Sequence, residues 1–192
     1  MRVVPVTRGA AIPRPERARV AGFTAAPGTA AMLVGRKRRL LLVALDEPEA
    51  TGALAIGRLP HDAHVAIDAR LLSPATAASL AAGAMLRGWR FDRLRTRPDP
   101  DGTRLERLDV LTPDPDAARA AWDQLRPGVE GALFARDLVA EPSNVLTPQG
   151  LVARLARLER EGVQVEVLNA PQLAGEGFGA LLAVGGASVH PP

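Results

Sequence analysis

Several residue types are absent or scarce in this sequence, and each absence excludes a class of protein. There is no cysteine, so disulfides, thiolate metal sites and a cysteine nucleophile are all excluded. Aromatic residues make up only 3% of the chain, so a core must be built mainly from Ala, Leu and Val. No apolar run approaches the roughly 18 residues of a membrane-spanning helix, and the first residues lack the apolar region of a signal peptide. These features predict a soluble, unexported protein and fit a reducing cytoplasm.

Lysine is nearly absent as well, because Lys37 is the one basic residue that is not an arginine. Basic residues exceed acidic ones by only 24 − 21 = 3, so the high isoelectric point reflects arginine content rather than a large excess charge. The one tight basic cluster is residues 36–39. A nucleic-acid surface needs basic residues gathered on one face, so we interpret the charge mainly as solvated surface and expect no nucleic-acid partner.

The chain divides into three expected parts. Residues 1–31 are rich in Pro, Gly, Ala and Thr, and we interpret them as an irregular arm with at most a short strand at Val3 and Val4. Residues 32–145 alternate predicted strands with predicted helices, which is typical of an α/β sheet with helices on its faces. The expected strands cover residues 40–45, 64–68 and 105–111. The expected helices begin at Ser73-Pro74, at Asp114 or Asp116 (reaching Trp122), and near residue 129 (ending near 139).

Residues 146–192 form the third expected part. Thr147 and Pro148 predict a helix start, with the threonine as N-cap and proline at the first helical position. An apolar stripe follows, and Gly162 suits the position after the helix end. The alternating valines of 163–167 and the apolar run 180–184 both predict strands. The sequence therefore predicts a linking helix and an incomplete second α/β domain.

Histidines offer little for metal binding. His61 and His64 lie close in sequence, with Asp62 between them, but the segment leads into a predicted strand, where this spacing sends the side chains to opposite faces. His190 has no companion residue that would complete a site. We interpret all three as surface residues rather than metal ligands.

Other motifs are equally weak. The glycine-rich residues 175–179 precede a predicted strand, whereas a dinucleotide loop follows a strand and opens a helix, so we interpret them as a turn. The carboxylate pairs Glu47/Glu49 and Asp99/Asp101 lie in Pro-containing turns, where acidic residues serve capping and solubility. We assign no catalytic, cofactor-binding or metal-binding residue in this chain.

Three stretches nevertheless resemble the leucyl aminopeptidase family of metallopeptidases. Residues 86–93, LRGWRFDR, are similar to a helix end in the N-terminal domain of that family. Residues 131–148, GALFARDLVAEPSNVLTP, resemble its interdomain segment, and residues 166–168 with 179–185 resemble the opening of its catalytic domain. The chain departs from the family pattern at Ala140, where asparagine is common, and at residues 185–188, where the family usually has Gly-x-Gly-Ser.

The resemblance implies a macro-domain-like N-terminal domain with a mixed sheet and a peptidase domain that removes N-terminal residues, often Leu, from peptides. It further implies a pair of divalent metal ions (zinc or manganese), a cytoplasmic location and a homo-hexamer. In the family the metals are held by Lys, Asp and Glu downstream of the turn that residues 185–192 resemble. We therefore expect the metal-binding and catalytic motifs to lie beyond this chain, which should be inactive alone.

Two other interpretations remain open. The first part alone could be a macro-like module that binds a nucleotide or nucleic acid, or it could be a domain that sets assembly geometry. A reading frame that continues into the metal-binding motifs would favour the enzyme. A stop codon after residue 192 in the authentic gene would favour the other two.

Overall fold

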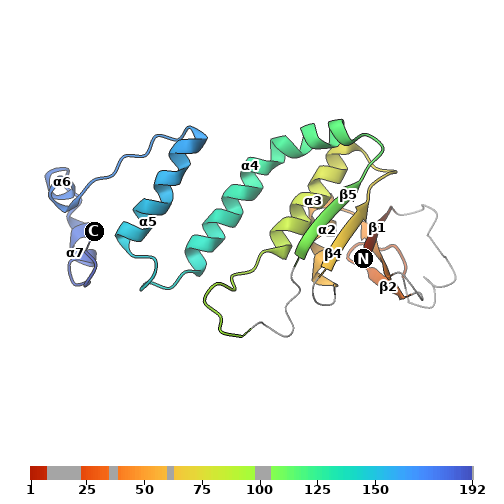
Figure 1. The fold of residues 1–192 in the computed structure, drawn as a ribbon, viewed down its shortest axis with the longest axis horizontal. Helices are drawn as coiled ribbons and strands as arrows, with labels where there is room; N and C mark the ends of the chain where they lie inside the picture. The colour runs from red at the N-terminus through yellow and green to blue at the C-terminus, as the bar shows by residue number, and fades with distance from the viewer. Residues whose placement is uncertain (8–22, 35–38, 60–62, 98–104, 192) are drawn as a thin grey trace. The chain divides into compact units, whose positions relative to one another are not determined.

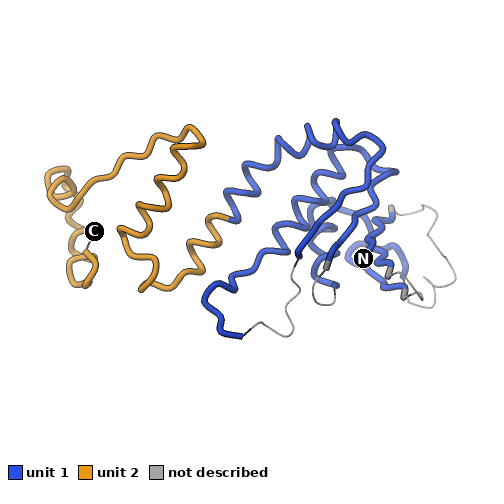
Figure 2. The backbone as a smooth tube through the Cα atoms, viewed as in Figure 1, with its two compact units in different colours: residues 1–133 blue, residues 134–192 orange. Residues whose placement is uncertain are grey.

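The computed structural model describes residues 1–7, 23–34, 39–59, 63–97 and 105–191. They form two compact units, Met1–Leu133 and Phe134–Pro192, which are coloured separately in Figure 2. In the described part of the chain, no helix combines the length and the apolar character needed to cross a membrane.

The first unit is built on a five-stranded mixed sheet with strand order β2-β3-β1-β4-β5 (Figure 1). The strands β1, β3, β4 and β5 run parallel, and β2 pairs antiparallel with β3. The strands are β1 (Arg2–Thr7), β2 (Ala30–Val34), β3 (Arg39–Leu45), β4 (Ala63–Asp68) and β5 (Leu105–Leu111). This mixed α/β arrangement confirms the fold class that the alternation of strands and helices predicts.

Three helices accompany this sheet: α2 (Pro48–Gly57), α3 (Pro74–Gly88) and α4 (Pro115–Ala140), the last of which continues into the second unit. The side chain of Ser73 accepts a hydrogen bond from the backbone N–H of Thr76 and Pro74 occupies the first turn, as predicted. The Asp114 carboxylate likewise accepts from the N–H of Ala117 at the start of α4.

Apolar side chains lie on both faces of the sheet because successive strand residues point to opposite sides. One cluster joins Val3, Leu41, Val65 and their neighbours to Ile56 of α2 and Leu80 of α3. The second cluster lies on the other face. It contains Val6, Phe23, Ala25, Ala31, Leu33, Leu42 and Ala44.

The helices α2 and α3 approach each other at two glycines. A Cβ atom added at Gly83 would lie 1.8 Å from the Glu49 carbonyl oxygen, and one at Gly52 would lie 2.0 Å from the Leu80 carbonyl oxygen. No side chain fits at either position without separating the helices. The small-residue face of α3 therefore serves helix–helix contact as well as packing on the sheet.

The description of residues 1–31 as an irregular arm is wrong for two segments. Residues 2–7 form β1, which lies between β3 and β4, and β2 begins at Ala30. Pro5 argues against an inner strand because proline has no N–H to donate. The Met1 carbonyl accepts a hydrogen bond from the backbone N–H of Ala66 in β4. Every second residue of β1 therefore directs its backbone N–H and C=O toward β4, and Pro5 is one of these residues. The register with β4 ends at Val3, so the missing N–H of Pro5 leaves no bond unmade.

The predicted break between two helices at 123–128 is also absent, because α4 runs through Pro127. A proline inside a helix frees the carbonyl four residues earlier. Here that carbonyl belongs to Asp123, and residues 123–128 are all exposed, so water can solvate it. Beyond Gly128 and Gly131, the Ala- and Leu-containing residues 132–140 favour the helix.

The described residues of the second unit contain helices and no strand. After the end of α4 these are α5 (Pro148–Leu155), the 3₁₀ helix η1 (Ala156–Glu161), α6 (Ala170–Gly175) and α7 (Gly179–Gly185). The helix start at Thr147 and the left-handed Gly162 (φ 83°) are confirmed. The strand predicted at 180–184 is wrong, because this Ala- and Leu-rich run forms α7. The strand predicted at 163–167 is also wrong, since this segment is paired with no described strand.

Candidate functional site

A cavity of about 560 Å³ lies in the first unit, between α3, β5 and the first half of α4. Its floor is apolar and made of small or flexible side chains from α3 and β5. These are Ala77, Ala78, Ala81, Met85, Leu108 and Val110. The small residues of α3 leave this space because their side chains stop short of α4.

The charged residues that line the cavity lie on α4. Arg119, Arg126 and Glu130 line it, with Trp122 between them. In an α-helix these positions recur on one face at a rotation of about 100° per residue. The spacing of residues 119, 122, 126 and 130 carries this signal in the sequence, but only for a helix without the break predicted at 123–128.

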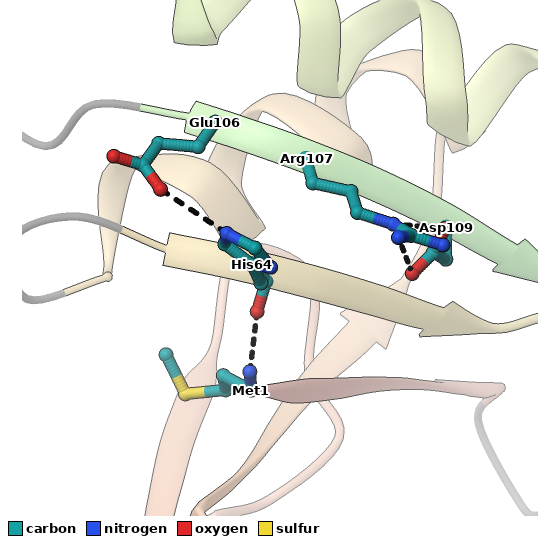
Figure 3. A network of polar contacts seen from close by, with 5 residues as sticks. All are labelled: Met1, His64, Glu106, Arg107 and Asp109. Atoms are coloured by element: carbon teal, nitrogen blue, oxygen red, sulfur yellow. Dashed lines mark hydrogen bonds and ion pairs between the residues drawn. The ribbon is translucent and has the colours of Figure 1, made fainter.

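A second polar feature lies across β4 and β5 (Figure 3). The His64 imidazole lies 3.1 Å from the Glu106 carboxylate, and the guanidinium of Arg107 donates to Asp109 at 2.9 Å. The terminal ammonium of Met1 donates to the His64 carbonyl. Both side-chain pairs are largely exposed, so water competes for their bonds and they contribute little stability.

Asp68, at the end of β4, is held between two arginines. Its carboxylate accepts hydrogen bonds from Arg70 at 2.8 Å and from Arg2. The hydrogen bond from Arg70 lowers the pKa of Asp68, burial opposes this, and Arg2 adds a further hydrogen bond and charge, bringing the pKa to about 2. Asp68 is therefore ionised at neutral pH and unsuited to exchange protons there. Its role is structural.

Of the histidines considered as metal ligands, the structure describes His64 and His190. His64 pairs with Glu106, and His61 and Asp62 lie outside the described residues. His190 is exposed, and its backbone N–H donates to the Ser188 hydroxyl.

Two of the remaining motifs have local structural roles. Residues 175–179 make a turn, as predicted, but it joins α6 to α7 rather than leading to a strand. Glu47 is the N-cap residue of α2 and Glu49 lies in its first turn, so this pair lies at a helix start rather than in the predicted turn. The pair Asp99/Asp101 and residues 36–38 lie outside the described part of the chain.

The described residues do not fit a divalent metal pair. Nowhere among them do three His, Asp or Glu side chains converge as such a site requires.

Comparison with known proteins shows which proteins this chain is similar to. Residues 133–192 match the sequence model described as the Cytosol aminopeptidase family, catalytic domain. A protein of Nitrobacter hamburgensis called "Probable cytosol aminopeptidase" is 42% identical over 122 residues, covering 62% of this chain and 24% of that protein. One of the same name from Rhizobium johnstonii is 36% identical over 173 residues, covering 87% and 35% respectively.

The chain belongs to the cytosol aminopeptidase family. This confirms the resemblance that residues 86–93, 131–148, 166–168 and 179–185 carry. The chain spans between 24% and 35% of the length of these two relatives.

Solved structures agree on the fold. The bottromycin maturation enzyme BotP is 26% identical, with a TM-score of 0.76, covering 98% of this chain and 44% of that one. A mutant of tomato leucine aminopeptidase has a TM-score of 0.78 over 100% of this chain and 46% of that one. At 18% identity the tomato enzyme supports the fold alone.

Proposed function

We propose that this chain is the amino-terminal region of a metal-dependent aminopeptidase that removes N-terminal residues, often Leu, from peptides. The observation that carries the proposal is the match of residues 133–192 to the catalytic-domain model of the family. The 42% identity over 122 residues to the Nitrobacter hamburgensis protein supports it.

The catalytic chemistry is proposed to reside in a part of the protein that residues 1–192 do not supply. A pair of divalent ions, zinc or manganese, would polarise the scissile carbonyl and supply a hydroxide nucleophile. The BotP structure in complex with Mn supports this choice of metal by analogy, but the fold is all that a 24% identical neighbour establishes. The role proposed for this chain is to supply the N-terminal domain, the helix α4 and the first residues of the peptidase domain. Assembly as a homo-hexamer in the cytoplasm belongs to the same proposal.

A chimera tests the proposal. The 122 aligned residues of the Nitrobacter hamburgensis protein are replaced by their counterparts from this chain, and hydrolysis of leucine anilide is measured with added manganese or zinc. We expect the chimera to keep metal-dependent activity and the isolated chain to show none. A folded chimera without activity beside an active parent would refute the proposal.

The isolated chain provides a second test. Nucleotide or nucleic-acid binding that persists at physiological salt would favour the binding-module alternative, because weak contacts to phosphates are lost as salt rises.

A further inference from the structure

The cavity between α3, β5 and α4 has the properties of a small-ligand site. Its volume of about 560 Å³ lies within the range of about 300–1,000 Å³ found for ligand pockets. An apolar floor with a few charged groups at its edge is the usual composition of such pockets. All of its lining residues belong to the unit Met1–Leu133.

Two charged residues on its α4 wall have no partner among the residues that the structure describes. The structure gives Arg119 and Glu130 no hydrogen bond or ion pair with another described residue, whereas the third charged residue, Arg126, lies 3.6 Å from Asp123. Arg119 and Glu130 are eleven residues apart, which on a helix places them about 20° apart around the axis and about 16 Å apart along it. The cavity thus has an available cation toward one end and an available anion toward the other.

This charge arrangement complements a zwitterion with an apolar body. A carboxylate at Arg119 would also lie near the start of α4, where the helix dipole favours negative charge. An ammonium group would face Glu130. An extended peptide spans about 3.3–3.6 Å per residue, so three or four residues bridge most of the distance once the two side chains lean inward. A free amino acid is too short to reach both.

We propose that this cavity binds a short apolar peptide of three or four residues, with its carboxylate on Arg119, its ammonium group on Glu130 and its side chains over Ala81, Met85 and Trp122. The choice of a peptide as ligand rests on the proposed aminopeptidase function, but the site itself lies within residues 77–130 and is tested without turnover.

Calorimetry with the whole chain and trileucine as the probe tests the charge pairing. The chain is titrated at low salt with trileucine, its N-acetyl form, its C-amide form and leucine, and mass spectrometry checks that the peptides stay intact. We expect each cap to weaken binding about fivefold, which corresponds to roughly 1 kcal/mol for one exposed ion pair. Leucine should bind more weakly than either capped peptide.

Matched variants assign each cap to its residue. Arg119→Gln should weaken trileucine about fivefold and leave the C-amide form unchanged, and Glu130→Gln should do the same for the N-acetyl form. The exposed residues Arg160 and Glu159 supply the controls Arg160→Gln and Glu159→Gln, which should bind trileucine like the parent.

Filling the cavity provides an independent measurement. Ala81→Leu places a larger side chain on the floor and should abolish binding, whereas Ala75→Leu, at an exposed position of the same helix, should not. Trp122 fluorescence should change on binding to the parent and not to Ala81→Leu.

Three results would overturn the proposal: no binding of trileucine at low salt, equal binding of the free and capped peptides, or unchanged binding by Ala81→Leu. If octanoate binds and only Arg119→Gln weakens it while trileucine fails, the occupant is a fatty acid. None of these results affects the activity of the chimera, so the two proposals fail separately.

Discussion

The two units of this chain differ in the contacts that stabilise them. Apart from Leu173, every apolar residue that the structure describes as buried lies within Met1–Leu133. In the second unit Phe178, Leu181, Val184 and Val189 are all about half exposed or more. The strands of the first unit therefore rest on contacts between residues distant in sequence, whereas the helices of the second rest on local signals.

In the second unit these local signals include side-chain caps at two helix starts. Thr147 caps α5 through a hydrogen bond from the N–H of Gly150, and Asn169 and Gln172 form a reciprocal capping box at α6. Capping specifies where a helix begins but contributes only about 1 kcal/mol per cap. A short helix without a buried face is marginal in water. We therefore expect the second unit to open far more readily than the first.

The largest expected effect is in protease sensitivity. Trypsin should cleave after Arg157 and Arg160 of η1 at least about a hundredfold faster than after Arg58 and Arg87, because local opening there costs several kcal/mol less. All four arginines are exposed, so accessibility alone does not separate them. Mass spectrometry over a time course gives the four rates. Equal rates would show that the second unit is as well held as the first.

The next effect concerns the contact between α2 and α3. Gly83→Ala places a methyl group where the Glu49 carbonyl oxygen lies, so the helices must move apart. We expect the free energy of unfolding of the first unit to fall by roughly 1–3 kcal/mol, as for other overpacked cores. Urea denaturation followed by circular dichroism measures this loss.

The control for this variant is Gly57→Ala on α2. A methyl group there meets the Arg87 side chain at 3.5 Å, an ordinary contact, so stability should change by no more than about 0.5 kcal/mol. A Gly83→Ala protein as stable as the Gly57→Ala protein would mean that α2 and α3 are less closely packed than described.

A smaller effect is expected at Asp68. Its folded pKa of about 2 lies below the value of about 3.9 for an unfolded chain, so its pairing stabilises the fold above pH 4. This contribution is lost as the pH falls from about 4 toward 2. Because the arginine partners are partly exposed, we expect Asp68→Asn to cost roughly 1–2 kcal/mol at pH 7 and progressively less below pH 4.

Asp109→Asn provides the comparison for Asp68. Asp109 pairs with Arg107 at a more exposed position, so its loss should cost less than about 0.5 kcal/mol. Denaturant curves at pH 7, 4 and 3 test both variants. A constant cost for Asp68→Asn across this range would show that its charge is not what stabilises the fold.

The success of sequence prediction follows the same division between local and distant signals. The capped helix starts at Ser73 and Thr147 and the apolar strand 40–45 were predictable because each carries its signal within a few residues. The strand at 2–7 was predicted only as a short strand at Val3 and Val4. Whether an inner strand can contain Pro5 depends on where its pairing with β4 stops, which the sequence does not show. The run 180–184 was assigned to the wrong class because a short apolar segment fits a helix and a strand equally well.

The cavity residues were predictable only in part. The helical spacing of Arg119, Trp122 and Glu130 is visible in the sequence once α4 is taken as continuous. The sequence does not predict that Ala77 and Ala81 line the same cavity as these residues, because this depends on how α3 and α4 lie beside β5. Family membership was predictable because residues 131–148 preserve order and spacing that no physical rule requires.

The smallest expected effect tests the continuity of α4, the one helix that both units share. Gly128 and Gly131 lie in its middle, and a Cβ atom at either would meet nothing within 4 Å. An exposed glycine inside a helix costs about 0.5–1 kcal/mol relative to alanine, so Gly131→Ala and Gly128→Ala should each stabilise a continuous helix by about that amount. Their combination should add, and helical circular dichroism should survive to a higher temperature. If the chain instead breaks near Pro127, Gly128 lies outside a helix, and Gly128→Ala would give no gain while Gly131→Ala still gives one. That outcome would restore the two-helix interpretation.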